Sequence, residues 1–305
     1  MILCAGEILA DMIGEEKRGS FFFERKPGGA PFNVACAVKK LGGAAGFVGS
    51  VGDDITGDFL TEFAVSRNFD MLDINRDKDK NTTLAFVEIA ENGERSFCFH
   101  RKHTADPYLP PISDNTLNKA DIVHIGSLML SSESGLACFV DLARRAKSLG
   151  KKISFDVNFR SDVFNGEKSA ITAYKQVLPL CDVIKFSEDE TEIFGRKYID
   201  EELSGALRCI SKGAKGSEIM YEDAQALIPS FKVSPIDTTG AGDAFFGGVL
   251  FGLDRLGRKP TLSDLQDIFA FANACGALNT LKRGAIDGLP SYNTVKNFIK
   301  RGKNE

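Results

Sequence analysis

Residues 235–245 of the chain are PIDTTGAGDAF, a polar turn with two glycines that leads directly into an apolar segment. That segment, 244–253, is long enough for a buried helix. Gly240 and Gly242 permit unusual backbone conformations, and the unpaired N–H groups of a first helical turn attract anions such as a phosphoryl group. Asp243 would repel such a ligand, which indicates that it accepts a proton. A capped helix start explains the same sequence equally well.

The composition indicates a globular protein with one large core. The chain has 305 residues, 43% of them hydrophobic, and its 38 basic and 42 acidic residues are mixed along the sequence. We therefore expect no nucleic-acid partner. There is no basic leader and no apolar run of membrane-spanning length, so we expect a cytoplasmic protein without a membrane partner. The seven scattered cysteines are expected to be free thiols.

Strand-like and helix-like segments alternate through the middle of the chain. Residues 122–125, 153–156 and 182–186 are typical of buried strands, and 133–149 of an amphipathic helix. Such alternation predicts right-handed βαβ crossovers and a parallel sheet. Further strands are expected at 2–8, 45–51, 216–221 and 226–228, and further helices at 244–256, 262–281 and 292–300. These elements predict a single α/β domain over residues 1–305.

Two segments interrupt this alternation. The aromatic stretch 20–24 is strongly β-prone, and 84–99 has the pattern of a hairpin around Asn92-Gly93. Together they predict a small antiparallel sheet outside the main sheet, formed by residues of about 12–27 and 82–101. A separate sheet beside a ligand site is typical of a lid.

Polar groups follow several of the predicted strands. Asp11 follows 2–8, and the segments 156–160, 187–190 and 237–243 follow later strands. Ligands bind beyond the carboxyl ends of parallel strands, so these groups are expected on one rim. Arg160 offers a planar fork of donors for phosphate oxygens, and Glu190 is expected to hold a hydrated Mg²⁺ through water.

A second glycine pair precedes an early helix. Gly28 and Gly29 allow close approach of a ligand to the backbone, and Asn33 in the first helical turn can bond a hydroxyl-rich molecule. Donors for a phosphoryl group, a metal site and a proton acceptor together predict phosphoryl transfer.

At this point a resemblance to a known family is visible. The stretches GGAPFNVA (28–35) and DTTGAGDAF (237–245) resemble the two signatures of the ribokinase-like (PfkB) carbohydrate kinases, and the chain is most similar to fructokinases over 6–285. The resemblance implies a three-layer α/β/α fold with a mostly parallel central sheet and a small antiparallel β lid. It also implies ATP as phosphoryl donor, Mg²⁺, a K⁺ site, and homodimers through the lid.

The resemblance also implies roles for individual residues. Asp243 would be the general base, with Gly240, Ala241 and Gly242 forming the backbone anion hole and Arg160 assisting catalysis. The residues expected to contact the sugar are Asp11, Gly28, Gly29, Asn33, Phe97, Phe99 and Arg101, with Asp243. Those expected at the nucleotide are Ser187, Ser211, Gly213, Gly216, Gly242 and Asn273, and those at K⁺ are Asp237, Thr239, Asn279, Lys282 and Gly284.

The chain departs from the family pattern at one site. Many members have Asn-x-x-Glu where this chain has Ser187 followed by Glu190, which puts the asparagine's part in ordering magnesium and phosphate in doubt. We predict an ATP-dependent sugar kinase that acts on a primary hydroxyl, with D-fructose converted to fructose 6-phosphate. The alternatives are a 2-keto-3-deoxygluconate kinase, a ribokinase or a nucleoside kinase, and, in another class, a non-catalytic regulator that binds sugar or nucleotide.

Overall fold

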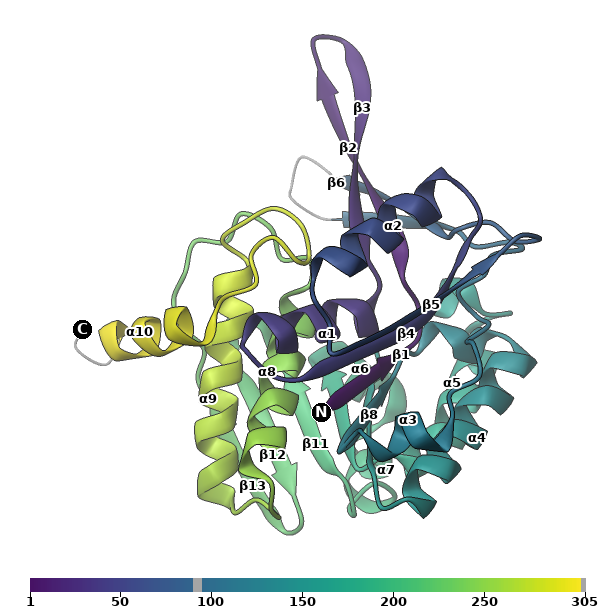
Figure 1. Cartoon of the computed structure of the whole chain (residues 1–305). Helices are drawn as coiled ribbons and strands as arrows, with labels where there is room; N and C mark the ends of the chain where they lie inside the picture. Colours follow the sequence, from purple (N-terminus) through teal and green to yellow (C-terminus); the bar gives the residue numbers. More distant parts are fainter. Residues whose placement is uncertain (90–94, 303–305) are drawn as a thin grey trace.

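The structure, a computed structural model, describes residues 1–89 and 95–302 (Figure 1). In this part of the chain, the large sheet has the strand order β13-β12-β11-β10-β9-β8-β1-β4-β5. Pairing is parallel from β11 to β5 and antiparallel at β12 and β13. The strands are β1 (Ile2–Ala5), β4 (Ala45–Gly52), β5 (Met71–Asp77), β8 (Ile122–Ile125), β9 (Lys152–Asp156), β10 (Val183–Ser187), β11 (Leu207–Ser211), β12 (Ser217–Tyr221) and β13 (Ala224–Ile228).

Helices cover both faces of this sheet, which confirms the three-layer α/β/α prediction (Figure 1). One face is covered by α1 (Ala30–Lys40), α2 (Ile55–Ser66), α8 (Ala241–Leu256) and α9 (Leu262–Asn279). The other is covered by α3 (Asp114–Asn118), α4 (Glu133–Ser148), α5 (Glu167–Val177), α6 (Glu188–Phe194) and α7 (Arg196–Glu201). The last helix, α10 (Tyr292–Gly302), packs on α9 at the edge of the molecule.

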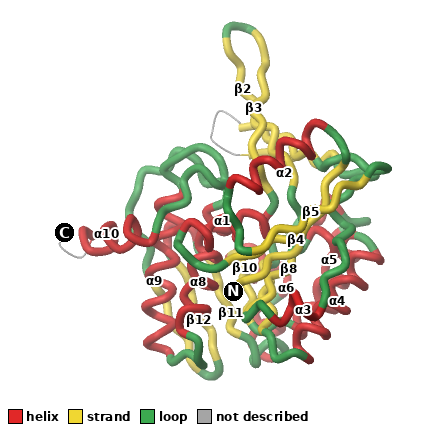
Figure 2. Tube along the Cα trace, in the orientation of Figure 1, coloured by secondary structure: helices red, strands yellow, loops and turns green. Residues whose placement is uncertain are grey.

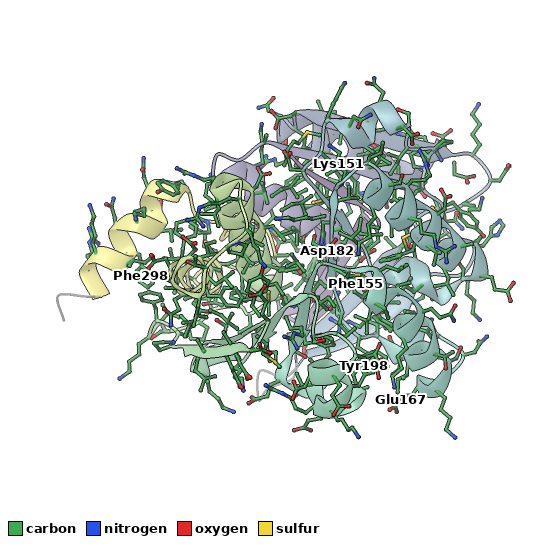
Figure 3. The ribbon with its side chains drawn as sticks, turned by 90° about the horizontal axis from the view of Figure 1, so that it is seen from below. Lys151, Phe155, Glu167, Asp182, Tyr198 and Phe298 are labelled. Carbon is green, nitrogen blue, oxygen red and sulfur yellow. The ribbon has the colours of Figure 1, made fainter. Side chains whose placement is uncertain are left out.

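Alternate side chains of the central strands enter two separate cores, as the two-residue period of a strand requires. In β1, Ile2 and Cys4 pack under α1 and α8, whereas Leu3 and Ala5 pack on the opposite face. Phe155 of β9 is fully buried in the second core, and Figure 3 shows it inside the molecule. This two-sided burial explains why the strands are almost continuously apolar.

A second, four-stranded sheet has the order β3-β2-β6-β7. Its strands are β2 (Leu9–Lys17), β3 (Ser20–Gly28), β6 (Leu84–Ile89) and β7 (Arg95–His100). The hairpins β2–β3 and β6–β7 are antiparallel, and the parallel pair β2–β6 joins them. The β2–β3 hairpin projects from the body as an arm (Figures 1 and 2). The turn predicted at Asn92-Gly93 lies outside the described residues.

Some predicted bounds were wrong. The first strand ends at Ala5 rather than at Ile8, because the chain turns at Gly6 (φ 153°), where a side chain would lie 2.8 Å from Pro31. Asp11 therefore lies on β2 of the small sheet and does not follow a central strand. The strands β5 and β11 were not predicted, and α8 begins at Ala241 rather than at residue 244. No helix among the described residues is long and apolar enough to span a lipid bilayer.

Candidate active site

A cavity of about 310 Å³ lies between the small sheet and the carboxyl ends of the central strands. The small sheet contributes Leu9, Asp11 and Phe99, and the start of α1 contributes Asn33. The structure thus gathers into one cavity many of the residues that the sequence placed at the site. The predicted residues that line it are Asp11, Gly29, Asn33, Phe99, Arg160, Thr239, Gly240, Gly242 and Asp243.

The glycine turn before α8 lines this cavity through Thr239, Gly240 and Gly242. Gly240 adopts a left-handed conformation (φ 70°) and is the residue before the first turn of α8, where no side chain of the described residues caps the backbone N–H groups. A side chain on Gly240 would lie 2.7 Å from the Ala285 backbone. Within the described residues, the Asp243 carboxylate accepts no hydrogen bond from the backbone of this turn; it accepts one from Asn33 Nδ2 at 2.8 Å. The Ala241 N–H donates to the Thr238 carbonyl at 3.2 Å, whereas the N–H groups of Gly240 and Gly242 have no acceptor among the described residues. Because both glycines line the cavity, this turn can bind an anion there.

The protonation of Asp243 is set by its surroundings. Burial, followed by the neighbouring Asp156 carboxylate, raises the pKa of Asp243 to about 6. The hydrogen bond from Asn33 and the charges of Lys185 and Arg160 act in the opposite direction. The carboxylate is therefore ionised at pH 7, with a pKa close enough to neutrality for efficient proton transfer.

A buried ion pair lies beside Asp243. Lys185 of β10 is adjacent to Asp156 of β9 in the sheet register, and its Nζ donates to both carboxylate oxygens at 2.8 Å. Both side chains line the cavity. The site predictions did not include Lys185, although a lysine inside the apolar strand Val183–Ser187 was a visible signal.

Glu7 also lines the cavity and was not predicted as a site residue. Its side chain is 1% exposed, and within the described residues neither carboxylate oxygen has a hydrogen-bond partner. Burial raises the pKa of Glu7 to about 7, against a smaller opposing effect of Arg101. An acid within the apolar run 2–10 was the signal for this residue.

Glu7 makes the stability of the ligand-free protein pH-dependent. Its folded-state pKa lies above the unfolded value of 4.5, so its ionisation destabilises the fold as pH rises from about 4.5 to 7. The integrated effect is about 3 kcal/mol. We expect Glu7→Gln to gain free energy of unfolding relative to wild type by this amount between pH 4 and pH 8, measured by urea unfolding. The same pH difference in both proteins would contradict the assignment.

A second cavity, of about 530 Å³, lies on the other side of the glycine turn. It contains the predicted nucleotide residues Ser211, Gly213, Gly216, Gly242 and Asn273. Asn273 is partly committed to structure, since its Nδ2 donates to the carbonyls of Ile228 at 3.0 Å and Pro229 at 3.2 Å. Gly242 and Thr238 line both cavities, which therefore meet at the first turn of α8.

The residues predicted for a monovalent cation lie behind this turn. Asp237 accepts hydrogen bonds from the backbone N–H groups of Thr239 at 2.6 Å and Gly284 at 2.8 Å. Asn279 Nδ2 donates to the Thr239 carbonyl at 3.1 Å. The buried Thr239 Oγ1 and Asn279 Oδ1 have no hydrogen-bond partner within the described residues. Lys282 lies in the loop after α9, with its backbone N–H 3.5 Å from the Asn279 carbonyl.

Several predicted residues lie outside the two cavities. The Arg101 side chain is 8% exposed, and its guanidinium bonds Asp106 at 2.7 Å and Ser131 at 2.5 Å. Gly28 packs so closely against Asp11 that a Cβ atom on Gly28 would lie 2.4 Å from the Asp11 carboxylate. Phe97 lies on β7, but its side chain is outside the described part of the structure. By contrast, Ala241 lines the second cavity but not the first.

Ser187 and Glu190 form the start of α6. Ser187 Oγ accepts from the Glu190 backbone N–H at 3.2 Å, and Glu190 Oε2 accepts from Ser187 N–H at 2.7 Å, which is a capping box. Glu190 Oε1 accepts from the Phe159 N–H at 2.6 Å. Burial raises the pKa of Glu190, and Lys185 opposes this rise. Both side chains therefore have a structural role at the helix start.

The comparisons with known proteins agree with this geometry. Residues 1–292 match the model of the pfkB family carbohydrate kinases. A probable fructokinase-7 of Arabidopsis thaliana is 34% identical over 98% of this chain and 92% of its own. The chain belongs to the pfkB family of carbohydrate kinases, whose members transfer a phosphoryl group to a sugar hydroxyl.

Solved structures extend the similarity to the whole fold. The fructokinase of Xylella fastidiosa with bound ATP has a TM-score of 0.88 and 31% identity, and covers 100% of this chain and 99% of its own. The fructokinase of Vibrio cholerae O395 bound to fructose, ADP and calcium has a TM-score of 0.87 and 30% identity, with 97% and 98% covered. A double mutant of the latter holds fructose, ADP and a potassium ion (TM-score 0.86, 29% identity, 97% of each chain).

Proposed function

We propose that this protein is an ATP-dependent fructokinase that converts D-fructose to fructose 6-phosphate. The observation that carries the proposal is the meeting of two cavities at Gly242, with Asp243 on the acceptor side. Relatives named fructokinases, including structures with ATP or with fructose and ADP, support the choice of both substrates.

The chemistry follows from the first cavity, lined by Asp11, Asn33 and Asp243, which we call the acceptor cavity. The sugar's primary hydroxyl would lie beside Asp243, which takes its proton as the hydroxyl oxygen attacks the γ-phosphorus of ATP. The bond from that phosphorus to the bridging oxygen of ADP breaks. The N–H groups of Gly240, Ala241 and Gly242 and the Arg160 guanidinium would stabilise the negative charge on the phosphoryl group. Asp11 and Asn33 would position the sugar through its other hydroxyls.

ADP release in the presence of different sugars tests the proposal. With ATP and Mg²⁺, we expect turnover with fructose to exceed that with ribose, 2-keto-3-deoxygluconate or nucleosides. Preference for one of those acceptors would replace fructose but retain the kinase. Binding of sugar and nucleotide without ADP release from any acceptor would favour the non-catalytic regulator.

The residues near the phosphoryl site fit magnesium only indirectly. No group of three or more acidic, histidine or cysteine side chains among the described residues has the spacing of a metal site. Mg²⁺ commonly keeps several waters and binds substrate phosphates, so Glu190 would reach it through water. Bound magnesium would neutralise charge on the phosphates of ATP.

The cation cluster behind the glycine turn fits K⁺ better. Thr239 Oγ1 and Asn279 Oδ1 are buried oxygens without hydrogen-bond partners in the described structure, beside the Asp237 carboxylate. Thr239 directly precedes Gly240, so a bound K⁺ would stabilise the conformation of the anion-binding turn.

Potassium is therefore expected to increase turnover. Replacing tetramethylammonium chloride by KCl at constant ionic strength should raise kcat several-fold, with little change in the affinity for fructose. Thr239→Val should reduce this stimulation, because it removes one oxygen of the cluster. Equal rates in both salts would contradict the K⁺ site.

The projecting arm supports a homodimer. Phe21, Phe22 and Phe23 of β3 are 54%, 55% and 42% exposed, which is an unusual concentration of apolar surface. We propose that this surface packs against the small sheet of a second copy.

A cytoplasmic location remains the prediction from the sequence.

Light scattering at micromolar concentrations should give about twice the monomer mass of 33.1 kDa for the wild type. The double variant Phe21→Ser/Phe22→Ser should give the monomer mass. Leu227→Ser is the matched control, because Leu227 is 68% exposed but lies on β13, the edge strand of the large sheet, and not on the small sheet. A monomeric wild type would contradict the dimer.

A further inference from the structure

The buried Lys185 is not explained by stability alone. Its side chain and that of Asp156 are 7% and 3% exposed, in a strand whose neighbouring side chains are apolar. A buried ion pair gains little over apolar residues of similar size, because both charges lose their hydration. A pair at this place in the central sheet therefore suggests a role in the cavity that it lines.

The ammonium group lies at the junction of the two cavities. A Cβ atom built on Gly242 would be 3.2 Å from Lys185 Nζ, so the ammonium lies directly beside the first turn of α8. Gly242 lines both cavities, and Asp243 is the next residue. Under the proposed function, the phosphoryl group passes this position as it moves from ATP to the sugar.

Lys185 also has a donor to spare. An ammonium has three N–H donors, and two are used by the Asp156 carboxylate at 2.8 Å. In the described part of the chain it has no other hydrogen-bond acceptor. Burial alone would lower the pKa of Lys185, but Asp156, Glu190 and Asp243 raise it above the ordinary value, so the amine stays charged.

The neighbouring polar side chains of β10 and α6 are less available. Ser187 and Glu190 bond each other's backbone at the start of α6, and Glu190 also accepts from Phe159. Arg160 and Lys185 are the cationic side chains among the described residues that line the acceptor cavity. Lys185 is the one that β10 holds within the sheet.

We propose that Lys185 is a further catalytic residue of the phosphoryl-transfer step. It would donate its third N–H to a non-bridging oxygen of the transferring phosphoryl group, while Asp156 positions the ammonium from behind. Lys185 keeps its proton throughout, and the sugar's proton goes to Asp243. The inference rests on the proposed kinase function.

Three variants separate this role from simple charge compensation. Lys185→Met removes the donor, Lys185→Met/Asp156→Asn removes both charges of the pair, and Asp156→Asn keeps the ammonium. Loss of a donor to the transition state typically costs about 10²–10³ in rate. We expect this loss in kcat for both variants that lack Lys185, with ADP and fructose affinities close to wild type. Lys197→Met, on the 84% exposed Lys197, is the control for loss of a lysine.

A transition-state analogue provides the readout that a structural role would not change. In calorimetry with fructose, ADP and fluoroaluminate, both variants without Lys185 should lose affinity for the ADP–fluoroaluminate complex but not for ADP. Asp156→Asn should bind that complex more tightly than Lys185→Met does. Recovery of turnover and analogue affinity in the double variant, or an equal loss in Asp156→Asn, would overturn the proposal. Absence of fructose-dependent ADP release in the wild type would instead refute the fructokinase function.

Discussion

Asp243→Asn is expected to lower kcat by roughly 10²–10⁴-fold, the usual contribution of a general base. Asparagine has almost the same shape and can still accept the hydrogen bond from Asn33, which the wild-type carboxylate accepts at 2.8 Å. The affinity for fructose should therefore change little, as measured by calorimetry. Asp267→Asn, an exposed acid on the adjacent helix α9, is the control and should keep wild-type turnover.

The same assignment predicts the pH dependence of the wild type. A base acts only when it is deprotonated, and the pKa of Asp243 is raised to about 6, so kcat/KM should fall as pH decreases through 6 and be constant above 7. Asp243→Asn should lack this acidic limb. Near-normal turnover of Asp243→Asn, with the limb intact, would contradict the base assignment.

Gly240→Ala is expected to lower kcat by about 10²–10³-fold, comparable to the loss of a donor from an oxyanion hole. The residue has φ 70°, and an added Cβ would lie 2.7 Å from the Ala285 backbone, so the turn must shift. The backbone N–H groups of Ala241 and Gly242 would then point away from the phosphoryl group. Steady-state kinetics measure the loss of kcat, and thermal unfolding measures the loss of stability from the strained turn.

The opposite end of α8 offers a matched control. Gly257 also has a left-handed conformation (φ 63°), but a Cβ atom added there would have no atom of the described residues within 4 Å. Gly257→Ala should cost about 1 kcal/mol of stability through backbone strain and leave kcat unchanged. Equal kinetic effects of the two substitutions would show that the Gly240 turn has no special role in catalysis.

Much of the fold was predictable because its signals are local. The alternation of strands and helices between residues 122 and 186 follows from apolar periodicity, and the structure confirms a parallel sheet there. The glycine turn at 240–242 was predicted because the glycines that permit its backbone conformation lie within three consecutive residues, directly before an apolar helical segment. β5 was missed because it is an edge strand with a partly polar sequence, Met71–Asp77.

The site was less predictable where it depends on pairing between distant segments. The Lys185–Asp156 pair forms between β10 and β9, which are neighbours in the sheet but are separated in sequence by α5. Neither residue alone therefore indicates the contact. Glu7 enters the cavity because the chain turns at Gly6 and continues into the small sheet. The same turn explains the position of Asp11. It was expected to follow the first central strand, but it reaches the cavity from β2 of the small sheet.

The most direct test of the fructokinase function is ³¹P NMR of the product formed from D-fructose and ATP. We expect fructose 6-phosphate and ADP in equal amounts, and roughly 10²–10⁴-fold less of both from Asp243→Asn over the same time. ADP with inorganic phosphate alone, fructose 1-phosphate, or phosphorylation of another sugar in preference to fructose would contradict it.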